Sequence, residues 1–98
     1  MARSGRYRLS PRAETDLEEI WLYTFRNWSL EQADAYVSRF VAAFEDLGSE
    51  ARKGRSVDAR EGYFKYAVGS HLIYYRRSRA GIDVIRVLHQ RMDPDRHL

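Results

Sequence analysis

The sequence predicts an α+β fold: an N-terminal strand, an antiparallel helix hairpin and a three-stranded antiparallel meander, with the helices on one face of the sheet. Three observations support it. Apolar residues recur at helical spacing in the first half of the chain, they alternate with period two from residue 63 onward, and turn signals separate these segments. Helices gathered on one face of such a sheet give a two-layer domain. At 98 residues, we expect one domain spanning residues 1–98.

The first strand and helix are predicted from residues 7 to 27. Tyr7 and Leu9 alternate with arginines, which indicates a short, half-buried strand. Ser10 is a favoured N-cap and Pro11 occupies the favoured first helical position, while the acidic residues of the next turn suit the positive end of the helix dipole. The predicted apolar stripe of this helix contains Ala13, Leu17, Ile20, Trp21, Thr24 and Trp28.

A second helix is predicted directly after the first. Ser29 and Gln32 have the spacing of a capping box, and Gly48 is a favourable C-cap. The short connection makes the two helices an antiparallel hairpin. The apolar positions of this second helix are Ala33, Tyr36, Val37, Phe40, Val41, Phe44 and Leu47.

The second half of the chain predicts a basic loop and then three strands. Residues 48–62 have no periodicity, and alternation begins at Tyr63. The pair Gly69-Ser70 predicts a type II′ hairpin turn, and Ala80-Gly81 predicts the next turn. Strands are therefore expected before, between and after these turns, and the tail at 90–98 is polar.

Composition and charge narrow the function classes. The chain has no cysteine, which excludes disulfides and thiolate metal sites, and it has no signal-peptide or membrane-helix segment, so we expect a cytoplasmic protein without a membrane partner. Residues 1–50 hold nine acidic and six basic residues, whereas residues 51–98 hold five and eleven. A basic half favours an acidic or nucleic-acid-associated partner, but it also fits a solvated basic face, and charge alone leaves both interpretations open.

Two stretches of the chain resemble a known family. Residues 7–13 (YRLSPRA) with 16–21 (DLEEIW) resemble the opening of ParE-type toxins. Residues 69–76 (GSHLIYYR) with 85–93 (IRVLHQRMD) are similar to the last two strands and tail of these toxins. The resemblance is to the ParE/RelE toxin–antitoxin superfamily, ParE branch, and it covers nearly the whole chain.

This resemblance implies a toxin of a type II toxin–antitoxin system that arrests growth by binding DNA gyrase. A ParD-like antitoxin would neutralise it in a hetero-oligomer. The implied mechanism is protein binding rather than catalysis, without a cofactor and without direct sequence-specific contact to nucleic acid. No pair of histidines has metal-ligand spacing, so no metal site is expected.

Two other function classes stay open. A RelE-like ribosome-dependent mRNA endonuclease would need an acid, a base and cations around the reacting phosphate. The chain offers Lys65, Arg76, Arg86 and His89, with His97 in the tail, but it has only two lysines and no tyrosine after the last strand. The other alternative is a non-toxic module that binds only an antitoxin.

Candidate binding residues fall into two groups. The residues expected to face gyrase are Arg86, His89, Gln90, Arg91 and Met92. The second group consists of rings on the two helices, where Tyr23 and Phe25 lie off the apolar stripe and add surplus apolar surface, and of a mid-strand arginine. Its members, expected to contact the antitoxin, are Trp21, Tyr23, Phe25, Trp28, Tyr36 and Arg76.

Overall fold

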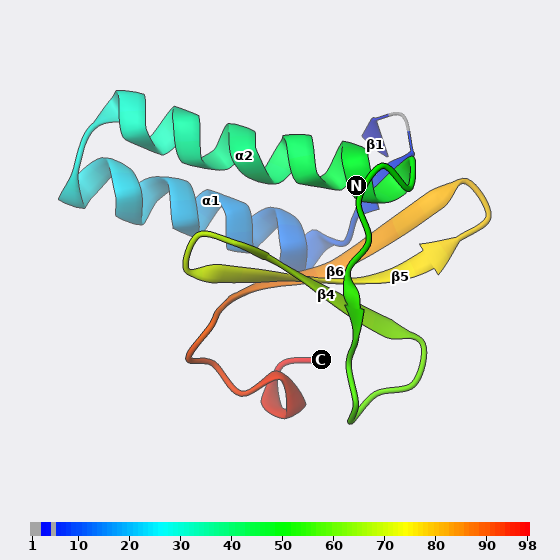
Figure 1. Ribbon diagram of the computed structural model, residues 1–98. Coiled ribbons are helices and arrows are strands. Elements are labelled where there is room, and N and C mark those ends of the chain that lie inside the picture. Colours follow the sequence, from blue (N-terminus) through cyan, green and yellow to red (C-terminus); the bar gives the residue numbers. More distant parts are fainter. Residues whose placement is uncertain (1–2, 5) are drawn as a thin grey trace.

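The computed structural model describes residues 3–4 and 6–98, and in these residues two helices cover one face of a six-stranded sheet (Figure 1). The predicted α+β class and the order of the helices and main strands are confirmed. The sheet order is β1-β2-β6-β5-β4-β3. The elements are β1 (Arg3–Ser4), β2 (Tyr7–Leu9), α1 (Pro11–Asn27), α2 (Leu30–Gly48), β3 (Arg55–Ser56), β4 (Tyr63–Val68), β5 (His71–Ser78), β6 (Gly81–His89) and the 3-10 helix η1 (Pro94–Arg96).

Helix α1 is fixed to the sheet by its own N-cap. The Ser10 hydroxyl accepts a hydrogen bond from the Ala13 amide at 3.0 Å, which confirms the predicted cap. The same hydroxyl donates to the Ile85 carbonyl at 2.7 Å, and the Ser10 amide donates to the Val84 carbonyl at 3.0 Å. One residue therefore begins the helix and holds it beside β6.

Helix α2 begins as predicted and ends slightly later than predicted. The Ser29 side chain accepts from the Gln32 amide at 3.1 Å. Gly48 lies inside the last turn instead of following it, and Ser49 is the C-cap. A Cβ atom at Gly48 would lie 2.5 Å from the Arg6 carbonyl oxygen, so the glycine is required by the close approach of the chain that leads into β2.

The sheet combines a meander with one parallel pair. Strands β4, β5 and β6 are joined by hairpins and pair antiparallel, as predicted, whereas β2 pairs parallel with β6. Gly69, the first central residue of the β4–β5 turn, has a φ of 56°, while Ser70 does not have a positive φ, which fits the predicted type II′ turn. The two-residue strands β1 and β3 extend the sheet edges and are too short to show periodicity.

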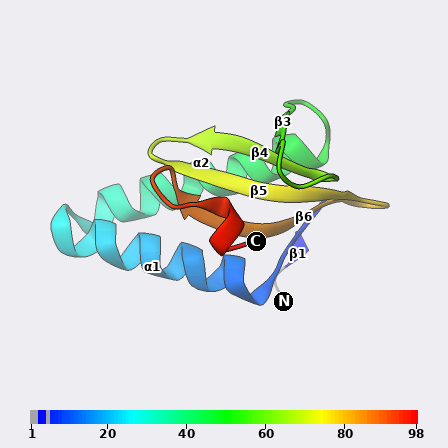
Figure 2. The same ribbon diagram turned by 90° about the horizontal axis from the view of Figure 1, so that it is seen from below.

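The side chains on the two faces of the sheet form two apolar clusters. The main core lies between helices and sheet, where Phe40, Phe44 and Tyr75 are fully buried. The sheet face opposite the helices is not fully solvated, because the Tyr74 side chain on it is only 2% exposed. It packs with Val57 and Leu88, and Leu98 from the tail covers this second cluster. Figures 1 and 2 show the C-terminal segment lying against the sheet face opposite the helices.

Among the helices in the described part of the chain, none is long and apolar enough to cross a membrane.

Candidate functional site

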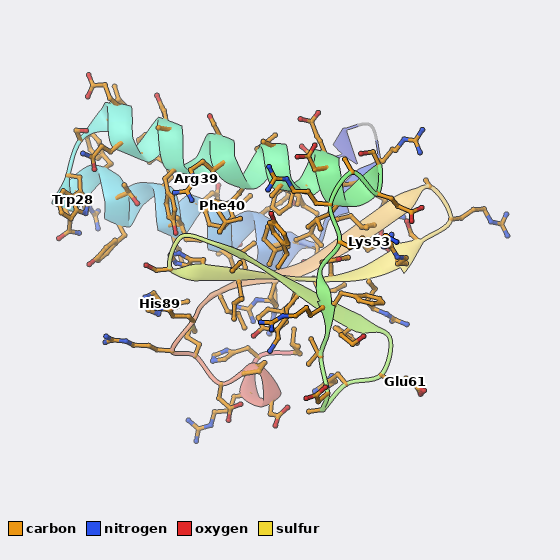
Figure 3. All side chains as sticks on the ribbon, viewed as in Figure 1. Trp28, Arg39, Phe40, Lys53, Glu61 and His89 are labelled. Atoms are coloured by element: carbon orange, nitrogen blue, oxygen red, sulfur yellow. The ribbon has the colours of Figure 1, made fainter. Side chains whose placement is uncertain are left out.

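A groove of about 850 Å³ opens where the helix hairpin meets the end of β6. The α1–α2 connection projects beyond the β4–β5 hairpin, so the sheet does not cover the tip of the helices (Figure 1). Trp28, Arg39 and His89 lie at this end of the molecule, away from Lys53 and Glu61 (Figure 3). The groove is lined by residues of both helices, the β4–β5 turn, β6 and the tail, among them Tyr23, Thr24, Trp28, Tyr36, Arg39, His71, His89 and Met92.

The rim of the groove carries exposed aromatic rings. Tyr23 is 66% exposed and Trp28 is 69% exposed. The placement of Trp28 on the core stripe of α1 was therefore wrong, because the sheet ends before the helix does. Large apolar side chains left open beside a concave surface are typical of a binding site. The groove thus has the apolar rim that a partner would cover.

Two other predicted aromatic residues lie outside the groove. The Trp21 ring stacks on Phe25 with centroids 5.2 Å apart, and its indole N–H donates to an Asp34 carboxylate oxygen at 2.9 Å. Neither ring lines the groove. The structure therefore gathers Tyr23, Trp28 and Tyr36 at one site and places Trp21 and Phe25 on a separate aromatic patch of the hairpin.

Tyr36 is anchored in the groove wall by its hydroxyl. This oxygen lies 2.8 Å from His71 Nδ1 and 3.2 Å from the Val68 carbonyl, and it accepts the Ser70 amide at 3.2 Å. Gly69 makes room for it, since a Cβ atom there would lie 2.6 Å from the hydroxyl. The ring and the β4–β5 turn are thus fixed together, which gives the groove a preformed wall.

Two histidines close the sheet side of the groove. The rings of His71 and His89 meet edge to face with centroids 5.3 Å apart. His89 Nδ1 accepts a hydrogen bond from the Arg91 amide at 3.1 Å. Burial lowers the pKa of His71 below its ordinary value, and the neighbouring His89 lowers it further. His71 was not among the predicted site residues.

Acidification is expected to destabilise the fold through His71. The unfolded chain protonates this histidine below about pH 6.5, while the folded protein resists protonation, so the unfolded state binds more protons in this range. The free energy of unfolding should therefore decrease as the pH falls below about 6.5. Urea denaturation on either side of that pH measures the effect. His71→Gln should show a weaker pH dependence than the wild type, and His97→Gln in the tail is the control. Equal pH dependence in His71→Gln and the wild type would contradict the assignment.

Asp16 and Arg86 form a buried ion pair in the wall of the groove. Asp16 accepts from Arg86 Nε at 2.8 Å, from Arg86 Nη2 at 2.9 Å and from the Val87 amide at 2.9 Å. The two side chains are only 10% and 12% exposed. The hydrogen bonds with Asp16 raise the pKa of Arg86. The Asp16 carboxylate also provides the acceptor for the Val87 amide, which lies on β6 beyond the residues that pair with β2. Asp16 was not among the predicted site residues, although an acidic residue within the apolar stripe of α1 is a sequence signal for a buried ion pair.

The tail continues from the groove and is held at two points. Arg86 Nη1 donates to the His97 carbonyl at 3.1 Å, and Arg60 Nη2 donates to the Leu98 carbonyl at 2.6 Å. Between β6 and these contacts, Gln90, Arg91 and Met92 are exposed. Three of the residues predicted to face a target therefore form an open segment, while Arg86 is occupied by Asp16.

Comparison with known proteins identifies the family. The family model described as ParE toxin of the type II toxin–antitoxin system, parDE, matches residues 7–94. The chain belongs to this ParE toxin family. Toxin ParE1 of Mycobacterium tuberculosis (strain CDC 1551 / Oshkosh) is 47% identical over 97 residues, which cover 97% of this chain and 99% of that protein. Toxin ParE1 of Caulobacter vibrioides is 40% identical over 93 residues, covering 94% and 96%.

A solved structure has the same fold. Its title is "Chromosomal ParDE TA system from P. aeruginosa", and it superposes with a TM-score of 0.73 at 17% identity, covering 88% of this ParE chain and 98% of the other. The recognised resemblance to ParE toxins is confirmed.

The residues considered for an mRNA endonuclease do not meet at one open site of this ParE chain. Lys65 and Arg86 flank Tyr74 in the strand register, but Tyr74 is buried and Arg86 is paired with Asp16. Burial raises the pKa of Tyr74. Arg76 lies over the Tyr63 ring outside the groove, whereas Arg86 and His89 both line the groove. His97 lies in the tail, where its carbonyl accepts a hydrogen bond from Arg86. In residues 3–4 and 6–98, no group of three or more acidic, histidine or cysteine side chains is placed to hold a metal ion.

Proposed function

We propose that this ParE toxin inhibits DNA gyrase by binding it, and that a ParD-like antitoxin neutralises it by occupying the groove. The observation that carries the proposal is the apolar groove between the helix hairpin and β6, which runs into the open tail segment. Membership in the toxin family supports the biological role. Both partners are cytoplasmic in such a system, so the cytoplasm is the proposed location.

The groove suits a segment that folds as it binds. A helix laid into an apolar groove anchors itself through a few large rings, and Tyr23 and Trp28 offer such anchors beside the fixed Tyr36. The Trp21–Phe25 patch lies on the same hairpin and would contact a segment that continues around α1. Arg76, on β5 outside the groove, would contribute only to a segment that reaches the sheet.

The tail is the proposed gyrase contact. Gln90, Arg91 and Met92 are exposed, whereas Arg86 would act by holding the tail through the His97 carbonyl. His89 and Met92 belong to both the tail segment and the groove lining. An antitoxin seated in the groove would therefore touch the gyrase-binding segment, which explains neutralisation by direct competition.

Inhibition by binding is favoured over mRNA cleavage because Lys65 and Arg76 lie outside the groove that Arg86 and His89 line, and Arg86 is paired with Asp16. The test adds the purified chain to a gyrase supercoiling reaction and to a ribosome-dependent mRNA cleavage assay. We expect supercoiling to be inhibited and the mRNA to stay intact, with antitoxin restoring supercoiling. Cuts in the mRNA would instead support the nuclease. Silence in both assays with antitoxin binding retained would support an inert module.

The contribution of the tail is tested in the same supercoiling reaction. The double variant Arg91→Ala/Met92→Ala should need about tenfold more protein for equal inhibition, which corresponds to a loss of about 1.4 kcal/mol and requires at least one of the two residues to be an anchor of the interface. Arg12→Ala, on the exposed face of α1, is the control and should inhibit like the wild type. Full inhibition by the double variant would remove the tail from the proposed gyrase contact.

A further inference from the structure

Charge is divided between the two layers of the molecule. The helix hairpin, residues 11–48, holds eight acidic and three basic residues. Residues 53–79, from the approach to β3 to the end of β5, hold seven basic and two acidic residues. The sheet edge formed by β3, β4 and β5 is therefore basic, and the helix layer is acidic.

Most of these cations have no acidic partner. Among the described residues, Lys53, Arg55, Lys65, Arg76, Arg77 and Arg79 form no ion pair with a carboxylate, and we refer to these six as the basic edge. The ion pairs found in the same residues join Arg8, Arg52 and Arg86 to other carboxylates. The charge of the basic edge is thus free to meet an external anion.

Neighbouring rings hold two of these cations in place. The Arg76 guanidinium lies 5.3 Å from the Tyr63 ring centroid, and the Arg77 guanidinium lies 5.7 Å from the Phe64 ring centroid. A guanidinium that rests on a ring keeps its N–H edge free, and this planar fork matches phosphate oxygens. Arg55 stands opposite Lys65 in the β3–β4 register, which adds two cations on adjacent strands.

The basic edge lacks the apolar centre of a protein interface. The exposed large hydrophobic residues of the described chain, Leu22, Tyr23, Phe25, Trp28, Leu30 and Met92, all lie on the helix hairpin or the tail. Interfaces between proteins have an apolar core with aromatic residues, whereas interfaces with nucleic acid are more polar and strongly positive. Figure 3 places Lys53 at the end of the molecule opposite Trp28 and His89, and no residue of the basic edge lines the groove.

We propose that the basic edge binds the phosphate backbone of nucleic acid without reading its sequence. Arg55 pairs with Lys65 in the β3–β4 register, and Arg76 pairs with Tyr63, two residues from Lys65 on β4. These three cations therefore project from one face of adjacent strands about 4.8 Å apart and can neutralise several phosphates along one backbone. The proposal goes beyond gyrase inhibition and antitoxin binding, because neither the groove nor the tail takes part in it.

The test measures the binding of a labelled duplex of mixed sequence to the full chain by fluorescence anisotropy at increasing salt. With about four phosphate contacts, affinity should fall about 100-fold between about 50 and 200 mM salt. The triple variant Arg55→Gln/Lys65→Gln/Arg76→Gln should bind more weakly at low salt and reduce the salt slope by about 3. The variant Arg12→Gln/Arg26→Gln/Arg39→Gln removes the same charge from the helix layer and should bind like the wild type.

Three results would overturn the proposal. An equal loss in both triple variants would show that net charge, and not the basic edge, determines binding. Comparable affinity for poly-glutamate would indicate a surface for an acidic protein, and a strong preference among duplex sequences would contradict backbone recognition. If the sheet variant does not fold, Arg55→Gln alone replaces it, since this exposed side chain lies on the edge strand. Gyrase inhibition by the sheet variant should match the wild type, so this test and that of the proposed function can fail independently.

Discussion

Replacing Asp16 with alanine is expected to lower the free energy of unfolding by about 3–5 kcal/mol. The substitution leaves the Arg86 guanidinium, whose side chain is 12% exposed, without its carboxylate, and it leaves the Val87 amide without an acceptor. The tail should loosen as well, because Arg86 also holds the His97 carbonyl. Urea denaturation followed by circular dichroism measures the loss.

Two comparisons isolate the ion pair as the cause. Glu18→Ala removes an exposed acid from the same helix and should change the free energy of unfolding by less than about 0.5 kcal/mol. The double variant Asp16→Leu/Arg86→Met removes both charges together and should be more stable than Asp16→Ala, since no unpaired charge remains. If Asp16→Ala is as stable as Glu18→Ala, the pair does not stabilise the fold.

The predictable parts of the fold depend on neighbours in the sequence. Ser10 and Ser29 cap their helices through amides three residues away, and the Gly69 turn needs only its own backbone conformation. Such features are visible in a short window. The parallel pairing of β2 with β6 joins residues about 75 positions apart, and nothing in either segment alone specifies it.

The β5–β6 register shows a second limit. Tyr75 pairs with Val84 and Tyr74 pairs with Arg86, so Ile85 is left between them as a bulge. Because a bulge shifts the alternation by one residue, a period-two pattern read through β6 cannot say which face Arg86 occupies. Its contact with Asp16 therefore became visible only in three dimensions.

The candidate site was predicted in part. Aromatic surplus on the hairpin was inferred from side chains off the apolar stripe, and the exposure of Tyr23 bears this out. The stripe itself misplaced Trp28, because periodicity gives the face of a helix but not the length of the sheet beneath it. Tyr36 was predicted from its ring alone. Its anchoring by the β4–β5 turn requires Gly69, which lies 33 residues away in the sequence but next to the Tyr36 hydroxyl in the fold, so no short window of sequence shows it.

Alanine at Trp28 is expected to weaken antitoxin binding by about 2–4 kcal/mol, or about 30- to 1000-fold in Kd. The ring is 69% exposed in the free toxin, so little packing is lost in the fold itself, and the melting temperature should stay close to that of the wild type. Tyr23→Ala, at the same rim, should act in the same direction. Isothermal titration calorimetry with the ParD-like antitoxin measures both.

The comparison with Phe25→Ala locates the interface. Phe25 is 44% exposed and stacks on Trp21 outside the groove, so its truncation should matter less than that of Trp28 if the antitoxin is seated mainly in the groove. Unchanged affinity in Trp28→Ala with a loss in Phe25→Ala would move the interface to the outer face of the hairpin.

Met92→Ala tests whether the antitoxin and gyrase compete for the same surface. Because Met92 lines the groove and belongs to the tail, its replacement should weaken antitoxin binding and gyrase inhibition together. A variant that loses one and keeps the other would separate the two surfaces and contradict neutralisation by competition.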